Sequence, residues 1–335
     1  MKTLIIGHED VKRVLSMAEC IRVMEDLFRT LARGDVVLPL RQVISQPDKK
    51  GGFGVMPAYL GSPRAIGGKF ITVFNGNRET PYESHQGAVL LFECDNGRLL
   101  AIVDATTVTN IRTAAASGAA TRVLAREDAH DLAILGSGTQ ASSHLAAMRA
   151  VRKINRTRVW SRNPEHARRF AETEGSEVQH VEASPSVGEA VSGADIICST
   201  TAATSPILKG EWISPGAHIN AIGATIPGFR ELDSKAMAIS KLYTDRKESL
   251  LSEADDFRLP LKEGAIKEDH LRGEVGEVLI GRVVGRYSNS EITLFKSHGL
   301  AAEDLAAAYY VYTEAEKKQL GTWVDFSGVR EPRIE

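Results

Sequence analysis

Residues 131–141, DLAILGSGTQA, decide the fold. The apolar run at 132–135 ends in a glycine-rich turn, and a helix-compatible segment, SSHLAAMRAV, follows directly. This is the G-x-G-x-x-A form of the dinucleotide fingerprint, in the strand-to-helix context that the motif requires. Gly136 permits the tight turn, Gly138 lacks the Cβ that would block a pyrophosphate, and Ala141 lets the helix pack closely on the strand. Free N–H groups at the helix start then face the phosphates. We expect the nucleotide to contact Gly136, Ser137, Gly138, Thr139 and Gln140.

From residue 131 onward, strand and helix patterns alternate. The expected strands are DLAILG, RTRVWSR, VQHVEA, ADIICST, HINAIG, AISKLYTD and ITLFKSHG. Such alternation predicts a parallel sheet with right-handed crossovers, which is a Rossmann-type α/β domain. Thr200, Ala224 and Ser297 lie at the ends of three of these strands and are further candidates for cofactor binding.

The N-terminal part has a different pattern. MKTLIIGHED begins with a short strand, and a capping box at Ser16 and Glu19 precedes a helix that Gly34 is placed to end. From about residue 36 the period changes to two, so VLPLRQVIS, GGFGVMPAYL and AIGGKFITVF are expected strands. QGAVLLFECDNGRLLAIVDA is expected to be a hairpin with Asn96 and Gly97 supplying the positive φ angles of its tight turn. These connections predict an antiparallel sheet.

Length and order suggest two domains. A chain of 335 residues exceeds the usual single-domain size. A helix from about residue 107 to 124, with the small-residue run RTAAASGAATRVLA, joins the halves, and the last helix, AAEDLAAAYYVYTEAEKKQL, can return to the N-terminal sheet. We expect residues 1–118 with 302–335 to form an antiparallel-sheet α+β domain, and 119–301 to form the Rossmann NAD(P)-binding domain.

Composition limits the classes of partner. The chain has 41 basic and 43 acidic residues and a net charge of −2, so neither nucleic acid nor an anionic membrane is an expected partner. No apolar run reaches the roughly 18–20 residues of a membrane helix, and the N-terminus lacks a secretory signal. The odd, widely spaced Cys20, Cys94 and Cys198 predict buried, reduced thiols in a cytoplasmic protein. No Cys/His spacing resembles a metal-ligand set, and GSGTQ is not a nucleophile elbow.

The end of the second expected strand of the Rossmann unit bears on cofactor choice. An acidic residue there binds the ribose 2′-OH of NAD(H), whereas a nearby Arg accommodates the 2′-phosphate of NADP(H). Here that end reads Trp160-Ser161-Arg162-Asn163, without a carboxylate. Arg162 can contact the phosphate directly, assisted by donors from Ser161 and Asn163. NADP(H) is therefore the preferred cofactor, and NAD(H) remains possible.

Several blocks resemble the ornithine cyclodeaminase/μ-crystallin family along nearly the whole chain. They are GVMPAY at 54–59, SHQGAVLLFE at 84–93, IRTAAASGAAT at 111–121, ILGSGTQASSHLAAM, INAIGA with PGFRELD after it, GEVGEVLIGRVVGR, and ITLFKSHGLAAEDLAAA. The resemblance implies an N-terminal antiparallel domain that dimerises, completed by the C-terminal helix, plus a Rossmann domain. It also implies hydride transfer between a nicotinamide and the α-carbon of an amino or imino acid.

The same resemblance implies that basic residues of the N-terminal domain hold the substrate α-carboxylate. The equivalent positions are Arg41, Lys69 and Arg112, and a buried carboxylate does need charge-assisted partners. Arg112 opens a run of small residues with no other charge nearby in the sequence, and Lys69 and Arg112 are the expected catalytic residues. For Arg112 the alternative is a structural ion pair, and for Arg41 it is a solvated edge charge.

Three histidines have open assignments. His85 either contacts substrate or braces its loop. His298 departs from the apolar residue usual in its block and is a weaker candidate for a contact with nicotinamide or substrate. His144, just after the fingerprint, is expected to have a packing role.

Two departures from the family pattern concern the reaction. Ornithine cyclodeaminase and related alanine dehydrogenases carry a catalytic Asp after the INAIGA-like strand, where this chain has Thr225, a neutral side chain that cannot act as a general base. The cyclodeaminase-specific Glu near MPAY is also missing, with Val55 and Met56 in that stretch. Both losses argue against cyclisation of ornithine. They are compatible with reduction of a preformed imine, which needs mainly orientation and a hydride.

The sequence therefore predicts an NAD(P)H-dependent reductase of 2-imino acids, such as pyrroline-2-carboxylate or piperideine-2-carboxylate, that forms L-amino acids. Arg41, Lys69, Arg112, His85 and Thr225 are its candidate substrate-binding residues. Linear imines remain open, among them the imine of pyruvate and iminosuccinate, whose second carboxylate would call for Arg78 or His85. Amino-acid dehydrogenase, ornithine cyclodeaminase and a non-enzymatic NADP-binding protein are the alternatives.

Overall fold

The computed structural model describes residues 2–48, 50–74, 76–77, 80–176, 180–326 and 328. The chain forms two compact units, one of Met1–Arg112 with Leu300–Glu335 and one of Thr113–Gly299, and each contains a sheet of eight strands. The division expected from sequence lies at 118/119 and 301/302. Helix α3 (Ala105–Leu124) runs without interruption through the first boundary, so no local break in the pattern marks it.

The second unit is a doubly wound α/β domain. Its strand order is β10-β9-β8-β11-β12-β15-β13-β14, and every neighbouring pair is parallel. In chain order the first five strands pair as 3-2-1-4-5, the arrangement that binds dinucleotides where the strand order reverses. The strands are β8 (Asp131–Leu135), β9 (Arg156–Trp160), β10 (His180–Ala183), β11 (Ile196–Ser199), β12 (His218–Ala221), β13 (Ser240–Thr244), β14 (Leu271–Glu274) and β15 (Ile292–Lys296).

Helices cover this parallel sheet and bury its central strands. All residues of β11 and β12 are buried, and so is β8 after its first residue, as expected for strands packed on both faces. Leu135, Ile197, Ile219 and Leu294 share one core with Phe257. The helices are α4 (Thr139–Val151), α5 (Pro164–Glu174), α6 (Val187–Val191), α7 (Ser234–Ile239), α8 (Lys247–Glu253), α9 (Asp255–Lys262) and α10 (Val275–Leu279), with 3-10 turns at Gly210–Trp212 and Glu268–His270.

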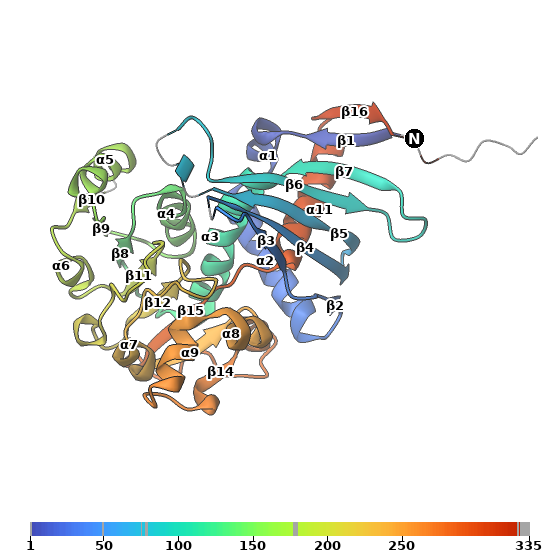
Figure 1. Cartoon of the computed structure of the whole chain (residues 1–335). Helices are drawn as coiled ribbons and strands as arrows, with labels where there is room; N and C mark the ends of the chain where they lie inside the picture. The colour runs from blue at the N-terminus through green and yellow to red at the C-terminus, as the bar shows by residue number, and fades with distance from the viewer. Residues whose placement is uncertain are drawn as a thin grey trace, which may run out of the picture. The chain divides into compact units, whose positions relative to one another are not determined.

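The first unit is an antiparallel sheet with helices on one face (Figure 1). Its order is β16-β1-β7-β6-β5-β4-β2, with β3 paired to β4, and only the β1–β7 pair among these is parallel. The strands are β1 (Lys2–Ile6), β2 (Val36–Val37), β3 (Gln42–Ser45), β4 (Gly52–Gly61), β5 (Arg64–Val73), β6 (His85–Phe92), β7 (Leu99–Asp104) and β16 (Thr322–Asp325).

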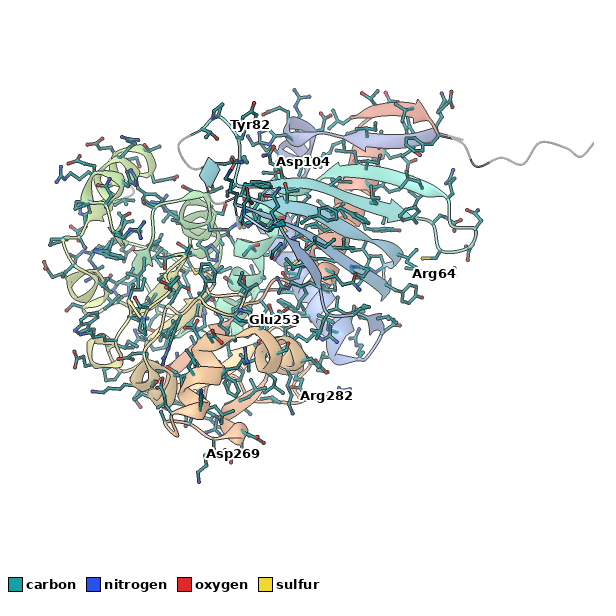
Figure 2. The ribbon with its side chains drawn as sticks, viewed as in Figure 1. Arg64, Tyr82, Asp104, Glu253, Asp269 and Arg282 are labelled. Atoms are coloured by element: carbon teal, nitrogen blue, oxygen red, sulfur yellow. The ribbon has the colours of Figure 1, made fainter. Side chains whose placement is uncertain are left out.

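Helix α11 (Ala301–Lys317) returns to this sheet from the far end of the chain, as the sequence allowed. It packs against β4, β5, β6 and β7 and against α2 (Met17–Ala32), while α1 (His8–Val14) lies beside it. Side chains of β5 alternate between the faces, so Ala65, Lys69 and Ile71 are buried whereas Ile66 and Phe70 are exposed. Helix α3 begins directly after Asp104, the last residue of β7 (Figure 2). Asp104 Oδ1 accepts the Thr107 N–H at 2.8 Å.

Three local predictions in this unit need correction. VLPLRQVIS is not one strand, because β2 and β3 are separated by a loop that contains Pro39 and Arg41. The β6–β7 hairpin has a six-residue loop at 93–98 in which Gly97, and not Asn96, has a positive φ. Ser16 Oγ does cap α2 by accepting the Glu19 N–H at 3.2 Å, but the Glu19 carboxylate contacts Arg22 instead of completing a capping box.

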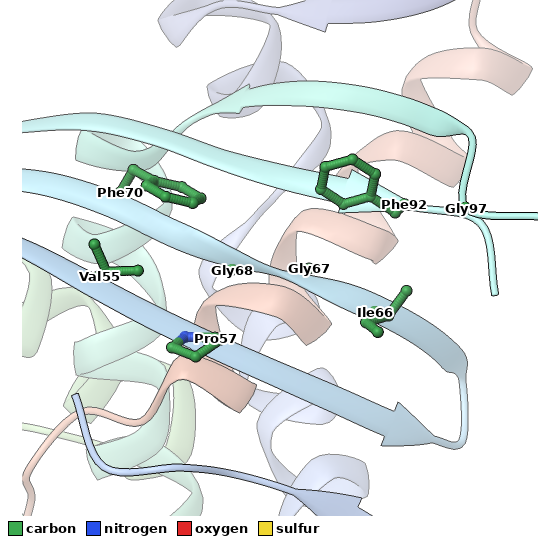
Figure 3. A pocket seen from close by; sticks show the side chains of 8 residues that line it. All are labelled: Val55, Pro57, Ile66, Gly67, Gly68, Phe70, Phe92 and Gly97. Atoms are coloured by element: carbon green, nitrogen blue, oxygen red, sulfur yellow. The ribbon is translucent and has the colours of Figure 1, made fainter. Parts of the chain in front are cut away.

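The face of the sheet opposite α11 is apolar and exposed. Phe53, Ile66 and Phe70 are each more than a third exposed, and Ile44 of β3, which pairs with Phe53, is more than half exposed. A shallow hollow of about 350 Å³ lies on this face (Figure 3). Its lining is Val55, Pro57, Ile66, Gly67, Gly68, Phe70, Phe92 and Gly97. A patch of this kind on a sheet is typical of an interaction surface.

Candidate functional site

The fingerprint forms the β8–α4 turn with the expected geometry. Gly136 has φ +114°, and a Cβ there would lie 2.7 Å from Thr200 Oγ1, so only glycine fits. Gly138 caps α4, and no atom lies within 4 Å of where its Cβ would stand. Ala141 is fully buried. The open space at Gly138 and the free N–H groups of α4 fit a pyrophosphate.

The candidate cofactor residues gather at one edge of the parallel sheet. Gly136, Ser137, Gly138, Thr139 and Gln140 follow β8, Thr200 follows β11, Ala224 follows β12, and Ser297 follows β15. Thr200 is tied to the fingerprint, because its N–H and Oγ1 both donate to Leu135 O, at 2.8 and 3.0 Å. The carboxyl ends of parallel strands are where such sheets bind ligands.

Ser161, Arg162 and Asn163 follow β9 at the same edge. Ser161 accepts a 3.0 Å hydrogen bond from Ser137 Oγ, which links this segment to the fingerprint. Arg162 is exposed, and Asn163 Oδ1 caps α5 by accepting the Glu165 N–H at 3.0 Å. The Asn163 oxygen therefore has a structural role that the sequence did not predict.

In the first unit, Lys69 and Arg112 meet at one carboxylate. Asp304 Oδ2 lies 2.8 Å from Lys69 Nζ, and Asp304 Oδ1 accepts a 2.7 Å hydrogen bond from Arg112 Nε. Glu303 Oε2 accepts a further 2.7 Å bond from Arg112 Nη1. All four side chains are at most 4% exposed. The expectation that Arg112 has no charge nearby thus holds only along the sequence, since its partners are 191 and 192 residues away.

Burial and these carboxylates set the electrostatics of the cluster. Burial lowers the pKa of Lys69 to about 8, against the attraction of Asp304, and the charges of Arg112 and Arg41 lower it further. The pKa of Asp304 is lowered by Arg112 and Lys69 although burial alone would raise it. Lys69 can therefore exchange a proton near neutral pH while Asp304 stays ionised.

The other described candidates of this unit, Arg41 and His85, lie on separate elements. Arg41 is half-buried in the loop before β3, close enough to Lys69 to influence its pKa. His85 begins β6, where its Nδ1 is 3.0 Å from Ser84 Oγ. Met56 stands opposite Lys69 in the β4–β5 ladder, while Val55 lines the outer hollow. Arg78 lies outside the described residues.

The remaining candidates from the second unit are Thr225 after β12, His298 after β15 and His144 in α4. Thr225 is half-buried in the loop after β12. His298 is 2% exposed, and Asp245 Oδ2 accepts its backbone N–H at 2.6 Å. His144 is buried between α4 and α3, with Nε2 3.0 Å from Ser117 Oγ. Burial lowers the pKa of His144 to about 4, so it is a neutral structural side chain.

Four acidic residues near these candidates escaped the sequence reasoning. Glu303 and Asp304 hold the two cations, Asp245 binds the backbone after β15, and Glu231 binds the loops after β11 and β12. The only available signal was that Glu303 and Asp304 are acids inside a small-residue block. Side chains of this kind are rarely buried without a partner.

Cysteines and surface features add little to the site. Cys20 and Cys198 are buried as predicted, whereas Cys94 is partly exposed because it follows the end of β6; all three are free thiols. Over the described ranges, no helix has the length and apolarity to cross a bilayer. The same residues contain no group of three or more His, Cys, Asp or Glu suited to a metal ion.

Known proteins resemble the chain over nearly its full length. It is 42% identical over 279 residues to the ketimine reductase mu-crystallin of Mus musculus, covering 83% of this chain and 85% of that protein. The Δ1-pyrroline-2-carboxylate reductase of Thermococcus litoralis, solved with NADH and L-proline, has a TM-score of 0.93 and 37% identity, covering 96% and 99% of the two chains. An archaeal alanine dehydrogenase dimer with bound NAD has a TM-score of 0.92 and 32% identity, covering 98% and 100%. Residues 1–319 match the sequence profile of one family. The chain belongs to the ornithine cyclodeaminase/mu-crystallin family.

Proposed function

We propose that the protein is a nicotinamide-dependent reductase that converts a 2-imino acid to an L-amino acid. The substrate is a cyclic ketimine such as pyrroline-2-carboxylate or piperideine-2-carboxylate. The observation that carries the proposal is the buried pair of cations, Lys69 and Arg112, held on Asp304. Cofactor binding alone would not need such a pair. The ketimine reductase and the pyrroline-2-carboxylate reductase among the similar proteins support the same substrate class.

Each group has an assigned task. Arg112 and Lys69, with Arg41, bind the α-carboxylate of the substrate, and His85 contacts the rest of the substrate molecule. Lys69 Nζ also holds a proton for the amine that forms, since its pKa of about 8 permits release near neutral pH. The bound reduced nicotinamide supplies the hydride. Thr225 cannot abstract a proton from an ammonium group, which favours a preformed imine over ornithine.

The cofactor is NADP(H) by preference, and NAD(H) is the alternative. Arg162 is exposed after β9, and residues 160–163 contain no carboxylate that would repel a 2′-phosphate. Gly136, Ser137, Gly138, Thr139 and Gln140 would hold the pyrophosphate. The similar solved enzymes were obtained with NADH and NAD, so the two cofactors have to be compared directly.

The functional assembly is a homodimer in the cytoplasm. Its interface is the exposed apolar face of the first unit, with Phe53, Ile66 and Phe70, which faces away from α11. The archaeal alanine dehydrogenase with the same fold is a dimer. Free thiols at Cys20, Cys94 and Cys198 suit a reducing compartment.

The test is oxidation of NADPH and NADH with a panel of imines. The panel contains pyrroline-2-carboxylate, piperideine-2-carboxylate, iminosuccinate, and pyruvate with ammonia. Turnover on a cyclic imine is expected, with lower KM for NADPH. Turnover only on a linear imine would change the proposed substrate class from cyclic to linear imines. Binding of cofactor without turnover on any imine would contradict the proposal. Arg112→Ala should still bind cofactor and lose turnover, which separates cofactor binding from the role proposed for Arg112.

A further inference from the structure

One buried carboxylate in the second unit binds two loops at once. Glu231 Oε1 accepts hydrogen bonds from Ser199 Oγ, the Thr201 N–H and Thr201 Oγ1, each at 2.7 Å. Its other oxygen accepts the Gly223 N–H, also at 2.7 Å. Ser199 and Thr201 lie where β11 ends, and Gly223 lies just after β12. Glu231 therefore ties together the ends of two neighbouring parallel strands.

A buried ion pair, Asp256 with Lys296, binds the backbone at Glu231. Asp256 Oδ1 accepts the backbone N–H groups of Glu231 and Leu232, at 2.8 and 3.0 Å. Asp256 Oδ2 lies 3.1 Å from Lys296 Nζ, at the last residue of β15, and that ammonium is 3.4 Å from Ala221 O. Glu231, Asp256 and Lys296 are all fully buried. The network thus joins β11, β12 and β15 at their carboxyl ends.

The loops in this network approach each other too closely to adjust freely. A Cβ on Gly223 would lie 1.7 Å from Thr201 O, so the two loops are in backbone contact. Thr200 lies between Ser199 and Thr201, which Glu231 binds, and Ala224 and Thr225 directly follow Gly223. A shift of either loop would therefore move residues at the edge of the sheet where a dinucleotide binds.

The strand order identifies which half of a dinucleotide these loops face. The fingerprint after β8 receives the pyrophosphate, and the end of β9 receives the adenosine ribose. Because β11 and β12 lie on the other side of β8, their ends face the second mononucleotide, which carries the reactive ring. This step rests on the proposed nicotinamide-dependent function.

We propose that Glu231 is a positioning residue that fixes the loops after β11 and β12 in the shape that orients the nicotinamide half of the cofactor. It does so through its four hydrogen bonds and does not touch the reacting atoms. All four partners donate, and only the ionised carboxylate accepts them together. Burial raises the pKa of Glu231, and the hydrogen bonds from Thr201 and Ser199 act against that rise. Loss of one oxygen acceptor would release Gly223 or Thr201 and leave the pyrophosphate turn intact.

The experiment compares Glu231→Gln with Asp233→Asn in the full-length protein. The glutamine has one acceptor oxygen, so it cannot accept from both loops. Asp233 lies in the same segment and also accepts two backbone N–H groups, from Gly210 and Ala236, but it binds neither loop. Each variant is titrated with NADPH, with NADH, and with ADP-ribose, which lacks the nicotinamide. Turnover on the best imine is measured below the unfolding transition.

The expected result separates the two halves of the cofactor. Glu231→Gln should lower kcat by about 10- to 100-fold, the effect of a misplacement near 1 Å. It should weaken binding of the reduced cofactor and leave ADP-ribose binding unchanged, while Asp233→Asn changes neither. A folded Glu231→Gln protein with parental kcat and affinity would overturn the proposal. An equal loss of ADP-ribose affinity would also overturn it, because the effect would then be general.

A second pair of variants applies if Glu231→Gln does not fold. Thr201→Val removes one hydroxyl donor to Glu231 with little change of shape, and Thr201→Ser keeps it. Lower kcat in the valine variant, with rescue by serine, would support the proposal, and equal kcat in both would overturn it. If the parent protein neither binds nicotinamide cofactor nor reduces any imine, the proposed function itself has failed. If the parent reduces an imine and the variant has the same kcat, only the role proposed for Glu231 has failed.

Discussion

Replacing Asp304 by Asn tests whether the buried cluster has the role assigned to it. The substitution keeps the shape but removes the charge that Lys69 Nζ and Arg112 Nε approach at 2.8 and 2.7 Å. Breaking a buried ion pair by removing one partner costs about 3–5 kcal/mol. At about 2–4 °C per kcal/mol for a domain of this size, the unfolding temperature of the first unit should fall by roughly 6–20 °C.

The matched control for this substitution is Glu303→Gln. Glu303 is equally buried and adjacent on α11, and its Oε2 accepts a hydrogen bond from Arg112 Nη1, while Arg112 keeps its bond to Asp304 in this variant. Its loss should be smaller, near the roughly 1.5–3 kcal/mol of a hydrogen bond to a charged group. Circular dichroism gives the transition, and hydrogen exchange of β5 and α11 amides reports on the first unit alone.

The same variant has a second readout in the pH profile. Burial lowers the pKa of Lys69 to about 8, and Asp304 is the largest influence that raises it. Removing Asp304 therefore lowers that pKa further, and the alkaline fall of kcat/KM should begin at a lower pH than in the parent or in Glu303→Gln. If Asp304→Asn melts with the control and keeps the parental pH profile, the argument that Asp304 holds both cations is refuted.

Other predictions follow from single contacts. Gly138→Ala should melt like the parent, because its Cβ meets open space, yet lose at least roughly 10-fold in NADH affinity by fluorescence titration, about 1.4 kcal/mol. Parental affinity would show that no phosphate comes near it. Arg162→Ala should raise KM for NADPH roughly 10-fold, the loss of one charge-assisted bond, and spare NADH; equal changes would exclude a 2′-phosphate contact. In the parent, kcat/KM for imine reduction should fall as pH rises through about 8, because Lys69 loses its proton, and a flat profile would remove Lys69 from that role. Phe70→Asp on the exposed face should convert a dimer to a monomer in sedimentation velocity, whereas an intact dimer would place the interface elsewhere.

The parts of the fold that the sequence predicted are those with local causes. The glycines of the β8–α4 turn, the apolar runs of β8, β11 and β12, and the period-two strands β4 and β5 each carry their own signal. β14, with the residues LRGE, was missed because it is short and polar and is a strand only through its pairing with β13. The loop at Pro39 was missed because period two continues across it.

The site was predictable only where chemistry is local. Arg112 could be identified as unusual from its small-residue neighbours, but its partners Glu303 and Asp304 lie on a helix that reaches it only after folding. Glu231 gave no sequence signal of its own, because its four donors come from residues 8 to 32 positions away. Which of these charges pair depends on the topology of the folded chain, and no local sequence motif indicates it.

The return of α11 to the first unit sets an order of assembly during synthesis. The second unit is continuous, from Thr113 to Gly299, and its residues have all left the ribosome before the first unit is complete. Until residues 300–317 emerge, the sheet face around Lys69 lacks its covering helix, and Lys69 and Arg112 lack their anions. The nucleotide-binding half can therefore mature first. The half that carries the Lys69–Arg112 cluster is finished last, when α11 has emerged.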